Sequence, residues 1–240
     1  MITARTARRY ALWSLFAITL SAASIFLWMR LQTVGSRGPA LQFVSPSLSN
    51  GWVPFGGDWK SQGKTILNDS EDRGPKMMNG SLKWKNYFIE ADIKLLGPYG
   101  DAGLIIRSSG EERGVDSYHG YFAGIRNMDN SFIFGRADFG WDQYIVKRIF
   151  PGVRGWYHIK LLAYGCSLAA SVTNETGLIV RSYVNDPHCI HEGRFGLKSY
   201  DTSAEWRNVR IGPSTLNQLQ KLTRGMTPAV VNSNLNEVDS

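Results

Sequence analysis

Cysteine is scarce in this chain, and residues 41–213 contain no apolar stripe with helical spacing. Only two of the 240 residues are cysteine, which excludes a disulfide-framework mini-protein and any cysteine-rich zinc or iron–sulfur site. A phosphate-cradling glycine loop and a nucleophile elbow are also missing. Hydrophobic residues make up 43% of the chain and aromatic residues 12%, with 25 glycines. This composition indicates a folded domain rich in β-structure.

The positive charge is concentrated at the N-terminus. Residues 1–37 contain five arginines and no acidic residue, whereas residues 38–213 contain 20 basic and 18 acidic residues. A nucleic-acid-binding protein carries its basic patch on the folded domain. The net charge of +7 therefore predicts no nucleic-acid partner.

Residues 11–29 form an uncharged apolar run that is long enough to cross a bilayer as a helix. Trp13 and Trp28 lie near its ends, as interfacial aromatic residues do. Three arginines precede it, which keeps residues 1–10 in the cytoplasm. The sequence predicts a single-pass membrane protein whose remaining residues are periplasmic or extracellular. The alternative is a signal peptide cleaved after Ser21-Ala22-Ala23.

From residue 41 the pattern changes to short runs of alternating polarity. In residues 87–95, Tyr87, Ile89, Ala91 and Ile93 share one side of a strand, which is the two-residue period of a half-buried strand. Further predicted strands are 52–55, 64–68, 76–79, 102–108, 118–126, 131–137, 143–149, 156–164, 166–173, 178–184, 194–200 and 204–211. So many short strands predict an all-β fold, a two-sheet antiparallel jelly-roll sandwich over residues 41–213.

The segments that flank the sandwich differ in composition. Residues 30–40 are predicted to be a linker between the membrane segment and the sandwich. Residues 214–240 are predicted to be a flexible tail, in which Leu216, Leu219 and Leu222 have the spacing of a short helix. The polar run after Pro228 has too few apolar residues to pack a core.

The two cysteines, Cys166 and Cys189, belong to segments interpreted as neighbouring strands. In an oxidising compartment they could form a disulfide, and otherwise they are small buried side chains. No metal site is predicted, because His188 and His191 beside Cys189 lack a second ligand cluster. No cofactor is predicted either. Calcium is the one candidate ion, because acidic residues in loops offer the oxygen ligands that it prefers. These residues are Asp69, Glu71, Asp72 and Asp101.

Several segments together resemble a known family. They are residues 52–59 (WVPFGGDW), 87–95 (YFIEADIKL), 102–107 (AGLIIR), 156–161 (WYHIKL), 193–197 (GRFGL) and 204–211 (AEWRNVRI). In order and spacing they resemble concanavalin A-like (LamG-like) domains, and most closely the bacterial 3-keto-disaccharide hydrolase family. The resemblance implies a concanavalin A-like sandwich and a carbohydrate-related function. The family pattern Gly-Tyr-Glu, however, reads Gly120-Tyr121-Phe122 here, so an expected carboxylate is replaced by phenylalanine.

Because of that replacement, the first functional hypothesis is a membrane-anchored, extracytoplasmic module that binds or senses a saccharide or another cell-surface ligand. Assuming that Phe122 faces away from the core, we expect a mixed arginine and aromatic surface on one sheet. Aromatic rings stack on sugars, and arginines donate hydrogen bonds to hydroxyl and carboxylate groups. The predicted ligand-binding residues are Arg107, Phe122, Arg126, Phe134, Arg136 and Trp141.

The second hypothesis is a glycoside hydrolase of the 3-keto-disaccharide hydrolase type. Such chemistry needs a pair of carboxylates on either side of the scissile bond. Glu90 and Asp92 share one side of a strand, and Glu205 belongs to another strand, so these three are the catalytic candidates if the protein is an enzyme. The third reading is a structural interaction domain with no small ligand.

Overall fold

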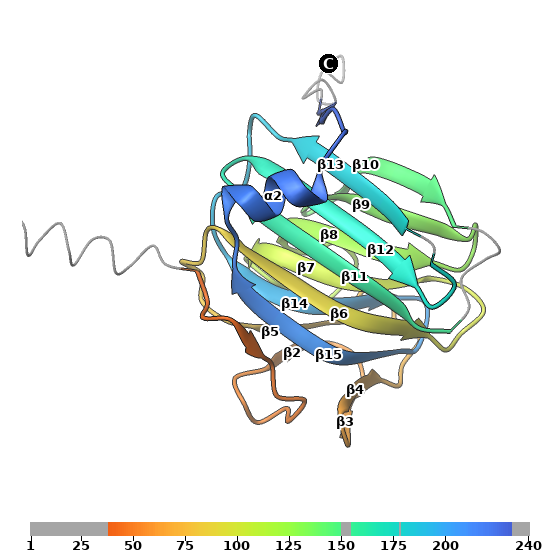
Figure 1. The fold of residues 1–240 in the computed structure, drawn as a ribbon. Helices are drawn as coiled ribbons and strands as arrows, with labels where there is room; N and C mark the ends of the chain where they lie inside the picture. The colour runs from red at the N-terminus through yellow and green to blue at the C-terminus, as the bar shows by residue number, and fades with distance from the viewer. Residues whose placement is uncertain (1–37, 150–154, 178, 232–240) are drawn as a thin grey trace, which may run out of the picture. The chain divides into compact units, whose positions relative to one another are not determined.

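The computed structural model describes residues 38–149, 155–177 and 179–231, which form two β-sheets packed face to face (Figure 1). Among these residues the larger sheet has nine strands, and its main path runs β16 (Ala229–Val230), β13 (Ile179–Asn185), β12 (Ser167–Asn174), β11 (Tyr157–Tyr164), β6 (Tyr87–Leu95), β15 (Ala204–Pro213), β4 (Thr65–Asn68) and β3 (Trp59–Gln62), with β1 (Gln42–Phe43) also paired to β15. The smaller sheet has seven described strands, in the order β10 (Trp141–Arg148), β9 (Ser131–Asp138), β8 (His119–Arg126), β7 (Asp101–Ser109), β14 (Arg194–Tyr200), β5 (Lys76–Asn79) and β2 (Val53–Phe55). The predicted all-β antiparallel sandwich is confirmed.

Strand β6 shows how the alternation builds the core. Tyr87, Ile89, Ala91 and Ile93 are fully buried between the two sheets, as their spacing predicts. The side chains between them, such as Glu90, lie on the outer face of the nine-stranded sheet. Since successive side chains of a strand point to opposite faces, each strand of the sandwich supplies both the core and one outer surface.

The predicted strands agree with the observed ones to within two residues at their ends. The prediction missed β1, β3 and β16, each of which has four residues or fewer. Strands this short carry too little alternation to be recognised, and they form because they pair with longer neighbours.

The segment after the sandwich is more ordered than the predicted tail up to residue 231. Helix α2 (Leu216–Leu222) begins at Thr215, whose side chain and Gln218 form a capping box. Its Leu219 packs with Phe88 and Leu162 on the outer face of the nine-stranded sheet, where α2 lies over β11 and β12 (Figure 1). The predicted helix is confirmed, and β16 pairs with β13 in parallel. Residues 232–240 lie outside the described residues.

The predicted membrane anchor, residues 11–29, also lies outside the described residues, as do residues 1–10 and most of the predicted linker 30–40. Within the described part of the chain, no helix has the length and apolar character that crossing a bilayer requires.

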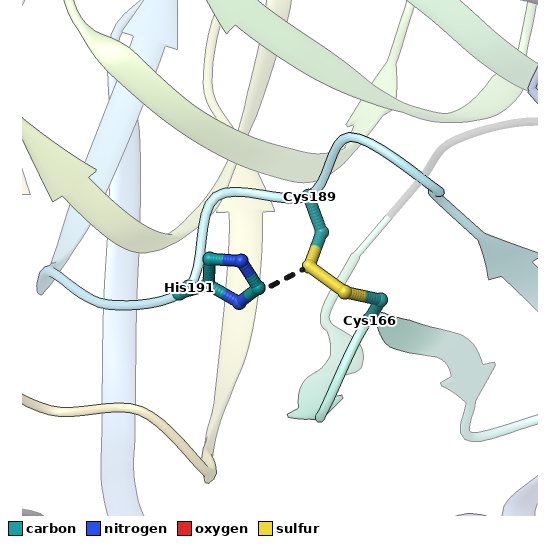
Figure 2. A group of neighbouring side chains, drawn as sticks. All are labelled: Cys166, Cys189 and His191. Atoms are coloured by element: carbon teal, nitrogen blue, oxygen red, sulfur yellow. Dashed lines mark hydrogen bonds between the residues drawn. A yellow bond between two sulfur atoms is a disulfide. The ribbon is translucent and has the colours of Figure 1, made fainter.

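Cys166 and Cys189 form a disulfide with a Cα–Cα distance of 5.4 Å (Figure 2). It joins the turn between β11 and β12 to the loop between β13 and β14. The Nδ1 atom of His191 lies 3.5 Å from the Sγ atom of Cys189. These three residues are a group of potential metal ligands, but a cysteine binds a metal as a thiolate, and the two sulfur atoms of a disulfide are not thiolates.

We expect that replacing both cysteines with alanine lowers the free energy of unfolding by about 3 kcal/mol, because the unfolded chain loses a covalent loop closure. Urea unfolding of the wild type and the double variant measures the difference. Reductant should lower the stability of the wild type and leave the double variant unchanged. Equal midpoints for the two oxidised proteins would contradict a stabilising disulfide.

Candidate ligand-binding site

A pocket of about 210 Å³ opens on the outer face of the seven-stranded sheet. It is lined by charged side chains and by aromatic or aliphatic ones: Asp101, Val115, Asp116, Phe122, Arg126, Ile133, Trp141, Lys198 and Tyr200. Phe122, Ile133 and the partly buried Trp141 belong to a hydrophobic cluster separate from the core between the sheets. The pocket therefore has an apolar side and a charged side.

The strand register brings the pocket residues together. Asp101 of β7 is paired with Arg126 of β8 on one side and with Tyr200 of β14 on the other. The next outward-facing pair in β7 and β8 is Gly103 and Gly124. A Cβ atom on Gly103 would lie only 2.2 Å from a backbone oxygen, and one on Gly124 only 2.6 Å from another. The ring of Phe122 also lies 2.6 Å from the Cβ position of Gly124, so the two glycines let the strands and this ring pack closely beside the charged row.

Both lining cations are already ion-paired. The Nζ atom of Lys198 lies 2.9 Å from Asp116 and 4.6 Å from the centre of the Phe122 ring. Arg126 donates two hydrogen bonds to Asp129, at 2.9 Å and 2.6 Å. This bidentate pair raises the pKa of Arg126 and lowers that of Asp129.

The loop that carries Val115 and Asp116 over the pocket is held by a buried lysine. Lys76 is fully buried and its Nζ donates to the backbone oxygens of Gly74, Glu112 and Gly114, at 2.7–3.2 Å. Burial, with the nearby charge of Lys198, lowers the pKa of Lys76 to about 8. These hydrogen bonds fix the backbone of the loop, so the pocket wall is built before any ligand arrives.

Asp101 differs from the other charged residues of the pocket. Its side chain is 8% exposed and its Oδ1 atom has no hydrogen-bond partner. Burial raises the pKa of Asp101 to about 6, with Asp116 acting in the same direction and Lys198 and Arg126 against it. A buried acceptor without a partner is uncommon in native proteins, and here it borders a cavity.

Three of the six predicted ligand-binding residues, Phe122, Arg126 and Trp141, line this pocket. Phe134 does not, because β9 pairs it with Ala123, whose side chain faces the core. Arg136 does not line the pocket either, because β9 pairs it with Tyr121, whose side chain also faces the core. Its guanidinium donates to Asp138 and to the backbone oxygen of His188. The prediction assumed that even-numbered residues of β8 and β9 share a face, whereas the register pairs even with odd.

Arg107 is also absent from the pocket. It is 1% exposed, with a φ angle of 54° at an irregularity in β7. Its guanidinium donates at 2.8 Å to the backbone oxygens of Lys85, Gly165 and Ile190. Arg107 therefore joins the start of β6, the β11–β12 turn and the disulfide-bonded loop. Its side chain is not accessible to a ligand.

The three predicted catalytic carboxylates lie on the other sheet. Burial acts to raise the pKa of Glu90, but the hydrogen bond from Lys160 at 2.7 Å and the charge of Arg210 bring it below its usual value. Glu205 lies 3.6 Å from Lys94. The strand pairs place these carboxylates on the outer face of the nine-stranded sheet, away from the pocket.

Asp92, the third of these carboxylates, is bound in the same way. Burial acts to raise its pKa, while hydrogen bonds from His158, Asn208 and Arg207, at 2.7–3.2 Å, lower it. A carboxylate held ionised by three donors is poorly suited to act as a general acid. No observation on this face favours catalysis by Glu90, Asp92 or Glu205.

Sequence reasoning missed Asp101, Asp116, Lys198 and Tyr200 as pocket residues. Asp101 was considered only as a loop acid that could bind calcium, and another of those acids, Asp69, pairs with Lys60 at 2.8 Å. The outward parity of β7 and β14 could have identified Asp101, Lys198 and Tyr200. Asp116 lies in a loop without periodicity, so only the tertiary structure reveals its position.

The two sheets and the small pocket on an outer face define a concanavalin A-like sandwich domain. Residues 45–212 match the family described as 3-keto-alpha-glucoside-1,2-lyase-like domains, and the chain belongs to this family. The resemblance noted in the sequence is confirmed by this match. No curated protein matches the chain.

Solved structures share the fold at low sequence identity. The carbohydrate binding module CBM66 from Bacillus subtilis is 21% identical, with a TM-score of 0.55, and the match covers 68% of this chain and 95% of that one. A B. subtilis protein of unknown function with a galectin-like fold is 11% identical, with a TM-score of 0.56, covering 74% and 97%. The VIP36 exoplasmic/lumenal domain in its Ca²⁺/Man3GlcNAc-bound form is 12% identical, with a TM-score of 0.55, covering 74% and 92%. These likenesses establish the fold alone.

The raised pKa of Asp101 predicts a pH-dependent contribution to stability. The protonated carboxyl favours the folded state below pH 4, and this contribution disappears as the pH rises through about 6. Because one pKa unit corresponds to 1.36 kcal/mol, the loss is on the order of 3 kcal/mol. Asp101→Asn should therefore be more stable than the wild type at pH 7 and similar to it at pH 4 in urea unfolding. The control is Asp201→Asn in the neighbouring loop, which should show no such gain; destabilisation of Asp101→Asn at pH 7 would contradict this account.

Arg107 and Arg136 offer a matched pair of substitutions. Arg107→Ala should lower the free energy of unfolding by about 3 kcal/mol or more, because three backbone acceptors lose their donor. Arg136→Ala should cost less, about 1–2 kcal/mol, because its partner Asp138 is half exposed. Its second partner, the buried Asp186 at 3.6 Å, keeps the hydrogen bonds from Tyr121 and Tyr144. Thermal or urea unfolding measures both. A loss for Arg107→Ala no greater than that for Arg136→Ala would show that the buried guanidinium is not a structural link.

Proposed function

We propose that this domain binds a single sugar residue in the pocket on the seven-stranded sheet. The observation that carries the proposal is the position of Asp101, a buried carboxylate with an unpartnered oxygen, in the same pocket as Phe122 and Trp141. A sugar ring has an apolar face that stacks on aromatic rings and hydroxyl groups that donate to a carboxylate. In this pocket the partly buried Trp141 supplies the ring, because Phe122 is fully buried beneath it and Lys198. Asp101 supplies the carboxylate.

The size of the pocket supports a small ligand. Pockets for drug-sized ligands measure roughly 300–1,000 Å³, whereas this one measures about 210 Å³. It suits one ring better than several consecutive rings of a polysaccharide. A terminal residue of a longer glycan would satisfy the same limit.

The comparisons support a carbohydrate ligand as well. The family name refers to a 3-keto-alpha-glucoside, and the structural neighbours include a carbohydrate binding module and a glycan-bound VIP36 domain. The fold hosts many functions, so these names support the proposal only together with the chemistry of the pocket.

A second candidate function is catalysis on a 3-keto-glucoside. One observation favours it: the pKa of Asp101 is about 6, which suits a group that exchanges a proton near neutral pH. Phe122 occupies the position where the family resemblance implies a glutamate, so Asp101 would have to act without that carboxylate. For this reason binding is our first proposal and catalysis the alternative.

We also propose that the domain is anchored to a membrane through residues 11–29 and faces the periplasm or the extracellular space. The uncharged run and the arginines before it support this orientation. The disulfide between Cys166 and Cys189 is consistent with it, because such bonds persist in oxidising compartments.

The binding proposal predicts that Trp141 matters and that a tryptophan on the other sheet does not. Trp141→Ala should weaken sugar binding about tenfold or more, which corresponds to about 1.4 kcal/mol. Trp156→Ala is the control, because Trp156 contacts Lys94 and Arg207 of the nine-stranded sheet. A glycan array identifies the ligand and titration calorimetry measures the two affinities. Equal losses in the two variants, or an array without binding, would refute a sugar site in this pocket.

The catalytic alternative is tested with 3-keto-glucosides and ordinary disaccharides incubated with the full chain. Product formation that Asp101→Asn abolishes and Glu90→Gln preserves would establish catalysis in the pocket. Product formation that depends on Glu90 would move the site to the nine-stranded sheet. Absence of turnover with binding retained would support the first proposal.

A further inference from the structure

The charges around the pocket form pairs, with one exception. Lys198 is paired with Asp116, and Arg126 with Asp129. Asp101 is the fifth charged group, and its Oδ1 atom has no partner. If Asp101 is ionised, these five groups sum to one negative charge, which is on a buried carboxylate beside the cavity. Lys76, which donates only to backbone oxygens behind the loop, is a further cation of this face.

A second buried polar group on this face also lacks a partner. Tyr118 is fully buried in the same hydrophobic cluster as Phe122, and its hydroxyl makes no hydrogen bond. Among the described residues four buried side-chain atoms lack partners, and three of them, on Asp101, Ser108 and Tyr118, belong to the seven-stranded sheet or the loop beside it. A polar group that has been removed from water without a partner is costly. A cationic ligand in the cavity would lower the cost of the charge on Asp101.

We propose, on the basis of the sugar-binding function above, that Asp101 makes the pocket selective for a sugar that carries an ammonium group. An ammonium group in the pocket neutralises the unpaired charge of Asp101. The Oδ1 atom itself is buried, so a direct hydrogen bond to it requires the carboxyl group to rotate toward the cavity. A neutral sugar can donate a hydroxyl but leaves the charge uncompensated. The expected order of affinity is therefore amino sugar, neutral sugar and, last, uronic acid.

Acidic sugars are disfavoured by the same set of charges. A ligand carboxylate would need a free cation, but Lys198 and Arg126 each already contact an aspartate of this chain. It would also lie near the carboxylates of Asp101 and Asp116 in a partly desolvated site, where like charges repel more strongly than in water. Lys198 and Arg126 therefore do not make the pocket a site for anions.

The experiment is titration calorimetry of the full chain at pH 7 with glucosamine, methyl glucoside and glucuronate as probes. We expect glucosamine to bind about tenfold or more tightly than methyl glucoside, and glucuronate to bind more weakly than either. Asp101→Asn should bring glucosamine and methyl glucoside to within about threefold of each other. The control Asp201→Asn, an exposed carboxylate outside the pocket lining, should keep the wild-type order.

The pH dependence of the wild type supplies a second measurement that needs no variant. The charged groups that face Asp101 are Lys198 of β14, Arg126 of β8 and Asp116 of the loop before β8. Below pH 6 Asp101 becomes protonated while an alkylammonium keeps its charge. Glucosamine affinity should fall about tenfold between pH 7 and pH 5, and methyl glucoside affinity should change less.

Two outcomes separate this inference from the proposed function. Methyl glucoside binding equal to or tighter than glucosamine binding, or a preference for glucuronate, would overturn the role of Asp101 and leave a sugar site in place. Failure of all three probes, and of every glycan on an array, would refute the proposed function together with the inference. Loss of the preference in Asp201→Asn to the same extent as in Asp101→Asn would also overturn it.

Discussion

The alternation of side chains along β7, β8 and β14 is the constraint on which the rest of this structure depends. In β8, Tyr121, Ala123 and Ile125 fill the core between the sheets, so Phe122 and Arg126 must face outward. A shift of one residue in the pairing would exchange the two sets. The core and the pocket are therefore specified by the same register, and a strand cannot change one without changing the other.

The carboxylates on the two outer faces differ in their hydrogen-bond partners and in the direction of their pKa shifts. On the nine-stranded sheet, Glu90 and Asp92 are each held by basic or polar partners that lower the pKa. On the seven-stranded sheet, Asp101 is left with an unpartnered oxygen and a raised pKa. An ionised Asp101 opposes folding, so the residue weakens the fold in the range where it carries charge. Groups that reduce stability in this way are typical of sites under functional demand.

The pocket is supported by contacts that reach beyond its own lining. Lys76 fixes the loop that carries Asp116. An ion pair between Arg194 of β14 and Glu111 holds the same loop. These interactions position the pocket wall in the absence of ligand. A pre-formed site avoids the ordering cost that a mobile loop would add to binding. In the same way Arg107, expected at the site, acts on the fold by linking three segments through their backbone oxygens.

The sequence by itself determined the fold class and the composition of the core. The alternation in residues 87–95 identified the buried side chains correctly, because a strand that is half buried must place its apolar residues at every second position. It also placed Phe122 and Arg126 on an outer face, and with Trp141 they do line the pocket. The spacing of Leu216, Leu219 and Leu222 identified α2 for a similar reason.

Only the tertiary structure decided which outward residues meet. The pairing of β8 with β9 matches even-numbered with odd-numbered residues, which moves Phe134 into the core, and local sequence does not encode that offset. Asp101, Asp116 and Lys198 come from β7, from the loop before β8 and from β14, respectively. Asp101 lacks a partner because none of the neighbouring side chains donates to its Oδ1 atom. Alternation is a property of one strand and can be read from its residues, whereas pairing register and charge balance are properties of the assembled sheets.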